Sequence, residues 1–169
     1  ANIEASAGGG KSALEGLVAL IEVVKGNNKG AVFVVLDLAS TVDTFLKDEA
    51  NPLNTIFGEL KEILGIKVDR LSTLISDKQG DLDAVAKTFT EDKQIIVTDL
   101  DTLGHKLVEG KDGAFRDNYL ETTHRLFDEF HRAVTDELVY VIGEGKAIIG
   151  DLSEFPFLRA MADLDTVYT

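Results

Sequence analysis

The spacing of the apolar residues constrains this chain more strongly than any other feature. Leu, Ile, Val and Phe recur mostly at intervals of three and four residues, the period of a helix with one buried face. Only two prolines interrupt the 169 residues, and we find no fixed-period repeat and no low-complexity linker. The pattern predicts an all-α, single-domain antiparallel helical bundle of about five to seven helices. Residues 12–169 are expected to form this domain, and residues 1–11 are expected to be a flexible N-terminal lead-in.

One segment has two readings. Residues 31–49 open with AVFVVLDLAS, which is apolar on every side for nearly two turns and rich in β-branched residues. Read alone, this stretch fits a buried strand. We predict a central helix instead, because Leu38 and Val42 continue the helical spacing and the pattern offers no second strand to pair with it. A further long helix is predicted over residues 116–142.

Both prolines mark helix starts. Asn51 is a good capping residue, and Pro52 after it is tolerated in a first helical turn. Pro156 opens a short closing helix over residues 156–164.

Charge and composition exclude several classes of function. The net charge is −13, so the general field repels a nucleic-acid backbone, and no Lys/Arg cluster offers a basic face for anionic membranes. The longest run without a charge is residues 50–58, far short of the ~20 residues that span a bilayer. The chain has no cysteine. It starts without Met, which fits signal-peptide removal as well as a shortened chain; we predict a secreted, acidic, cysteine-free protein.

A glycine-rich segment near the start raises the question of nucleotide binding. Residues 5–12 read ASAGGGKS, the spacing of a relaxed phosphate-binding loop. Such a loop needs a buried strand and a parallel sheet before its helix, whereas only four residues precede Ala5, and the strict motif has Gly at that position. We therefore interpret the segment as a lead-in to a helix capped by Ser12.

A polar stripe on the predicted long helix is the strongest candidate for a metal site. Glu121, His124, Asp128 and His131 are spaced 3, 4 and 3, which places them along one side of a helix. A di-iron bundle needs a second Glu-x-x-His, and Thr102 stands where the glutamate before His105 would be. We predict no metal site and no cofactor, and half-buried histidines at the helix boundary.

Catalytic arrangements are not evident. No serine lies in a Gly-x-Ser-x-Gly turn. The acidic pairs Asp48–Glu49, Asp128–Glu129 and Asp136–Glu137 are adjacent in sequence, and on a helix adjacent side chains point apart. We interpret them as solvated faces and predict that the protein is not an enzyme.

The remaining feature is an excess of apolar residues. Phenylalanine fills cores, but a bundle can also leave an elongated cavity between its helices. The sequence predicts a soluble, non-enzymatic carrier of a hydrophobic small molecule such as a lipid, fatty acid, sterol or pigment. The candidate ligand-binding residues are the apolar and polar side chains Phe33, Phe45, Phe57, Phe89, Phe127, Phe130, Tyr140, His124 and His131.

Two alternatives remain open. An interaction protein would self-assemble into a homo-oligomer, or dock a partner, through an apolar helix face, as the heptad-like spacing through residues 53–107 favours. A membrane-active helical protein would open to insert its second helix, although its charge disfavours anionic bilayers.

Overall fold

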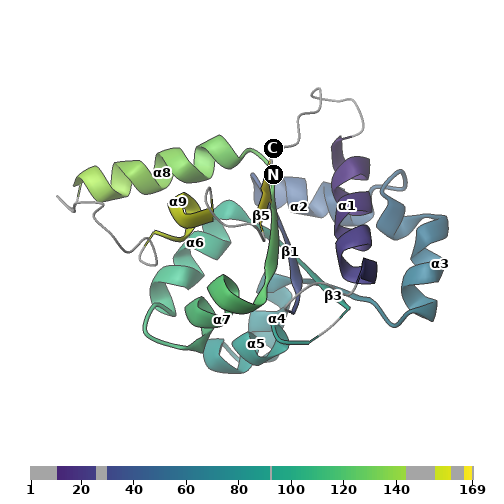
Figure 1. Ribbon diagram of the computed structural model, residues 1–169, viewed down its shortest axis with the longest axis horizontal. Coiled ribbons are helices and arrows are strands. Elements are labelled where there is room, and N and C mark those ends of the chain that lie inside the picture. Colours follow the sequence, from purple (N-terminus) through teal and green to yellow (C-terminus); the bar gives the residue numbers. More distant parts are fainter. Residues whose placement is uncertain (1–10, 26–29, 92, 144–154, 161–165, 169) are drawn as a thin grey trace.

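The computed structural model is an α/β protein built on a five-stranded sheet, with strand order β2-β3-β1-β4-β5 and every pairing parallel (Figure 1). It describes residues 11–25, 30–91, 93–143, 155–160 and 166–168. The glycine-rich part of the predicted lead-in therefore lies outside the described residues. The strands are β1 Val32–Leu36, β2 Lys67–Arg70, β3 Gln94–Asp99, β4 His124–Phe127 and β5 Thr166–Tyr168.

Helices cover both faces of this sheet (Figure 1). On one face lie α1 (Lys11–Lys25), α2 (Ala39–Lys47) and the 3-10 helix η1 (Pro52–Asn54), with α3 (Ile56–Ile63) packed beside η1. The other face is covered by α4 (Leu71–Asp77), α5 (Leu82–Thr88), α6 (Leu100–Glu109), α7 (Ala114–Thr122), α8 (Phe130–Gly143) and α9 (Pro156–Ala160).

The predicted all-α bundle is wrong, and β1 shows why. Every residue of β1 is buried, with Phe33 and Val35 in the core under one sheet face and Val32, Val34 and Leu36 in the core under the other. A central strand of a parallel sheet is covered on both faces, so it is apolar throughout and lacks the alternation that identifies an exposed strand. Its partners exist: β1 pairs with β3 from Val32↔Ile95 to Leu36↔Asp99, and with β4 on the other side.

The long helix predicted over residues 116–142 is also wrong. The chain forms α7, then β4, then α8 in this region. The predicted polar stripe is consequently divided: Glu121 lies at the end of α7, His124 begins β4, and His131 lies in the first turn of α8. The four residues do not share one helix face.

Candidate functional site

The structure does not gather the predicted ligand-binding residues at one place: Phe33, Phe89, Phe127 and Phe130 share one core, and Phe45 lies in the other. Five of the six phenylalanines are buried in the two cores, where they pack against other side chains, namely Phe33, Phe45, Phe89, Phe127 and Phe130. Phe57 and Tyr140 lie in α3 and α8, and their side chains are outside the described residues. The positions of these aromatic residues therefore give no support to a shared ligand cavity.

The two predicted histidines lie at opposite ends of β4. The half-buried His124 begins the strand, with its Nδ1 3.8 Å from Glu22 Oε2. The exposed His131 follows the other end of the strand, with its Nε2 3.4 Å from Glu129 Oε2. Within the described part of the chain, no three His, Asp or Glu side chains are grouped to hold a metal ion.

A pocket of about 500 Å³ lies elsewhere, between α6, α8 and the start of α9. Its walls are mainly apolar, from Leu100, Leu107, Val108, Phe155 and Phe157. None of the predicted ligand-binding residues lines it.

Acidic residues gather at the carboxyl ends of the three central strands. Asp99 ends β3 and is level with Leu36 of β1, while Asp128 directly follows Phe127, the partner of Val35. Asp99 and Asp128 therefore flank the end of β1 on its two sides, about 10 Å apart at ~4.8 Å per strand. Asp37 follows β1 between them.

This edge is also where the chain changes direction. After β1 the chain enters the α2 layer, whereas after β3 and β4 it enters the opposite layer through α6 and α8. Open parallel sheets bind ligands outside the carboxyl ends of their strands at such a switch point. The fold thus directs attention to Asp37, Asp99 and Asp128.

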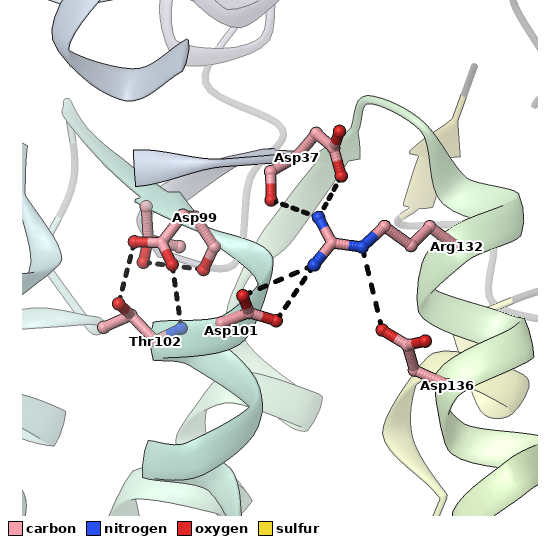
Figure 2. A network of polar contacts seen from close by, with 7 residues as sticks. Asp37, Asp99, Asp101, Thr102, Arg132 and Asp136 are labelled. Carbon is pink, nitrogen blue, oxygen red and sulfur yellow. Dashed lines mark hydrogen bonds and ion pairs between the residues drawn. The ribbon is translucent and has the colours of Figure 1, made fainter. Parts of the chain in front are cut away.

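One arginine connects the loops at this edge (Figure 2). Arg132 of α8 donates to the carboxylate of Asp37 and, at 2.8 Å, to its carbonyl oxygen. Its Nη2 lies 3.2 and 3.3 Å from the carboxylate oxygens of Asp101, and its Nε lies 3.8 Å from Asp136 Oδ2. The hydrogen bond to Asp37 is the main cause that raises the pKa of the Arg132 guanidinium above its ordinary value.

The strand ends continue directly into helices. Asp99 caps α6, because its Oδ2 accepts from the Thr102 N–H at 3.0 Å and its Oδ1 accepts from the Thr102 hydroxyl at 2.7 Å (Figure 2). After β4, Glu129 adopts φ +54° before α8 begins. Non-glycine residues in this conformation are costly and concentrate at functional sites.

The position of α1 completes the geometry. Glu22, near the carboxyl end of α1, lies beside His124 at the amino end of β4. Lys11 is 11 residues earlier, about 16 Å at ~1.5 Å per residue, which is the length of a five-residue strand at ~3.3 Å per residue. Ala19, Leu20 and Val23 pack α1 on the sheet. Because the carboxyl end of α1 lies beside the amino end of β4, α1 runs antiparallel to the strands (Figure 1). Its amino-terminal end lies at the carboxyl edge.

Sequence reasoning missed Asp37, Asp99 and Arg132, and it considered Asp128 only as part of a stripe on a helix. Asp128 and Glu129 were assigned to a helix face, yet they form the turn between a strand and a helix. A signal was present: three short apolar runs end in an acidic residue, VFVVLD, QIIVTD and RLFDE. Reading these runs as parallel strands would have placed the acids at one edge.

The fold and this edge define a class, an open α/β protein with a polar switch-point site. Comparison of the chain with family models, curated proteins and solved structures gives no match. Among the described residues no helix is long and apolar enough to cross a membrane, which confirms the prediction on that point.

Proposed function

We propose that this protein binds a nucleoside triphosphate, with Mg²⁺, at the carboxyl edge of its sheet. One observation carries the proposal: α1 begins at Lys11, directly after a glycine-rich sequence, and its amino-terminal end is directed to the carboxyl edge of a parallel sheet. A glycine-rich turn followed by Lys-Ser at a helix start supplies backbone N–H groups and a lysine for phosphate.

The proposal reverses our interpretation of residues 5–12. That interpretation rested partly on the absence of a parallel sheet, and the five-stranded sheet removes this part of the objection. The order of the elements still differs from that of the usual loop, because α1 precedes all of the described strands. Ala5 still departs from the strict motif, but Gly10, Lys11 and Ser12 retain the remainder of it. Because the loop binds phosphate mainly through backbone N–H groups, an alanine at position 5 removes no donor.

The acidic residues after β4 suit the metal that accompanies a triphosphate. Mg²⁺ in such sites takes one or two carboxylates together with phosphate oxygens and the Ser/Thr hydroxyl of the loop. Ser12 and Asp128 are the candidates for these two groups, and Glu129 is the candidate to orient an attacking water toward the terminal phosphate. The metal, Lys11 and the positive end of α1 would offset the repulsion from a net charge of −13.

Fluorescent ATP analogue binding tests the proposal. We expect N-methylanthraniloyl-ATP to bind in the presence of Mg²⁺, and Lys11→Ala to weaken binding by at least about tenfold, since one charge-assisted contact contributes ~1.5–3 kcal/mol. Lys25→Ala, at the other end of α1, is the matched control and should bind as the unaltered chain does. Absence of binding, or equal binding by both variants, would refute the proposal.

Phosphate release extends the test to hydrolysis. If Glu129 orients the water, Glu129→Gln should retain Mg²⁺-dependent nucleotide binding and lose most of the phosphate release. Asp77→Asn, at the exposed end of α4, is a control for the lost charge. Equal phosphate release by Glu129→Gln and the unaltered chain would remove Glu129 from this role.

The pocket favours a second candidate function, which is the predicted binding of a hydrophobic small molecule at a different place. Its volume of about 500 Å³ and its mainly apolar walls are typical of small-ligand sites. The uncharged fluorophore N-phenyl-1-naphthylamine tests it. Val108→Asp, in the pocket wall, should abolish probe binding, whereas Val24→Asp on the α1 layer should not; these valines are 63% and 52% exposed.

Self-assembly through an apolar helix face and membrane activity stay predictions.

A further inference from the structure

The pocket between α6, α8 and α9 has a floor that belongs to the protein core. Leu100, Leu107 and Phe157 line the pocket and are also members of the core cluster on that face of the sheet. The Phe157 ring packs edge to face against Phe127, with the ring centroids 5.8 Å apart. The Glu137 carboxylate accepts from the Phe157 N–H at 3.1 Å, which fixes the start of α9 to α8. The apolar floor is therefore preformed, and a ligand need not order it on binding.

The polar residues that line the pocket carry an excess of negative charge. Among the described residues, four carboxylates and one guanidinium line it, together with the imidazole of an exposed histidine: Asp101, Glu109, Asp136, Glu137, Arg116 and His105. Glu109 lies 3.2 Å from the Lys106 ammonium, and Glu137 holds the start of α9. The carboxylates that remain to face a ligand are those of Asp101 and Asp136.

Asp101 and Asp136 share one cation with a third carboxylate. Arg132 Nη2 lies 3.2 Å from Asp101 Oδ1, its Nε lies 3.8 Å from Asp136 Oδ2, and its Nη1 pairs with Asp37. In Figure 2 the two carboxylates of the pocket lie below the guanidinium and Asp37 lies above it. One positive charge thus serves three negative charges. The side chains of Asp101 and Asp136 are 61% and 59% exposed, so a second cation can reach them from the pocket.

We propose that the pocket takes a cationic amphiphile, a protonated alkylamine or arylalkylamine, with its ammonium group beside Asp101 and Asp136 and its apolar body on the pocket floor. The inference rests on the proposed binding of a hydrophobic small molecule in this pocket. The cavity and its floor define the site, and the charges decide which head group it accepts. An uncharged head group gains nothing from the two carboxylates, and an anionic one, as in a fatty acid, is repelled by them.

Displacement of N-phenyl-1-naphthylamine by three ligands with the same chain tests the inference. Decylamine, decanol and decanoate differ only in the head group, and each is used at neutral pH below its micelle-forming concentration. We expect half-displacement at about fivefold lower concentration for decylamine than for decanol, since each exposed ion pair contributes modestly. Decanoate should need a higher concentration than decanol. If decanoate displaces the probe as well as decylamine does, the inference is overturned while the hydrophobic-ligand function stands.

Asp136→Asn separates the pocket carboxylates from the general field of a chain with a net charge of −13. The preference for decylamine over decanol should fall by about twofold to threefold in this variant, because one ion pair is lost. Asp43→Asn is the matched control, since Asp43 lies on α2, is 54% exposed and also pairs with an arginine, Arg70. The control should keep the full preference.

Urea unfolding shows whether each variant is folded, and Asp101→Asn serves if Asp136→Asn is not. A preference for decylamine that the pocket variant leaves unchanged would overturn the inference, because the general field would then be its source. If neither the probe nor any of the three ligands binds the unaltered chain, both the inference and the hydrophobic-ligand function fail.

Discussion

Gly30 shows how much one residue can depend on its neighbours. A Cβ at this position would lie 2.1 Å from the Phe89 carbonyl oxygen and 2.6 Å from that of Thr122. Both are backbone atoms at the carboxyl ends of α5 and α7, so the strand could enter the sheet only after a backbone shift. In the sequence Gly30 looks like one more turn residue, since the close approach arises from segments about 60 and 90 residues away along the chain.

Gly30→Ala should therefore destabilise the protein by roughly 1–3 kcal/mol, the usual cost of overpacking. Urea unfolding followed by circular dichroism measures this loss. The control is Gly104→Ala in α6, whose added Cβ would meet Phe157 at 3.8 Å, an ordinary contact. That variant should be neutral or slightly stabilising, because alanine favours helix by up to ~1 kcal/mol over glycine. Similar unfolding midpoints for both variants would contradict the argument.

Arg125 is a second residue whose role depends on its surroundings. It is 2% exposed, and its Nη1 donates to the carbonyl oxygens of Tyr119 at 2.6 Å and of Leu120 and Thr123, each at 3.2 Å. These carbonyls end α7, and its Nε donates to the Thr166 hydroxyl of β5. One buried guanidinium thus caps the carboxyl end of α7 and connects it to the edge strand β5.

Arg125→Met should cost roughly 2–4 kcal/mol, because it leaves buried carbonyl oxygens without their donor. Arg159→Met is the comparison, since Arg159 pairs at 2.8 Å with Glu121 at an exposed position. Exposed pairs contribute about 0–1 kcal/mol. Chemical denaturation of both variants should separate them clearly, and an equal loss would show that burial does not determine the effect.

At the scale of elements, two substitutions separate the capping hydrogen bonds that Asp99 makes at the start of α6 from the negative charge of its carboxylate. Asp99→Ala removes both bonds to Thr102 and should cost about 1 kcal/mol, the usual value of an N-cap. Asp99→Asn keeps a capping oxygen and should cost a few tenths of that at most. Asp81→Ala, which removes the cap of α5 on Ala84, should match Asp99→Ala. A larger loss for Asp99→Asn than for Asp99→Ala would rule out capping as the main role.

The elements that sequence reasoning found are those with local signals. Asn51 caps a turn as predicted, its Oδ1 accepting from the Leu53 N–H at 3.0 Å, and Pro52 starts a helix of the 3-10 type. Pro156 likewise begins α9. Caps and first-turn prolines act within a few residues, so a single sequence contains enough information to place them.

The strands were missed because their signals are not local. β1, β3 and β4 are four to six residues long and buried on both faces, so each resembles part of a buried helix. Only pairing with strands distant in sequence distinguishes the two. The candidate site could not be assembled either, since Asp37, Asp99 and Asp128 lie at one edge only when those strands align.

At the scale of the whole molecule, the apolar excess has a simpler account than a ligand cavity. A central parallel sheet needs an apolar layer on each of its faces, and two separate cores are present among the described residues. The phenylalanines that suggested a ligand fill these cores. Phe33, for example, packs edge to face against Phe89 and Tyr119, with ring centroids 4.9 and 5.3 Å apart.

Nucleotide binding should be visible as a change in the stability of the whole fold. The proposed site joins α1, the exits of the central strands and α8, so a bound nucleotide must dissociate before the sheet can unfold. At a hundred times its Kd, a ligand that binds only the folded state adds about 2.7 kcal/mol. For a chain of this length that is a rise in Tm of roughly 5–11 °C.

Differential scanning calorimetry with Mg²⁺-ATP measures this rise, with MgCl₂ alone as the reference at equal ionic strength. The reference is essential because Mg²⁺ screens a net charge of −13 and stabilises the chain without any site. Lys11→Ala should show the rise with MgCl₂ but not the further rise with Mg²⁺-ATP. If the two chains respond to Mg²⁺-ATP alike, the stabilisation arises from general screening, and the carboxyl edge does not bind a triphosphate through the glycine-rich segment.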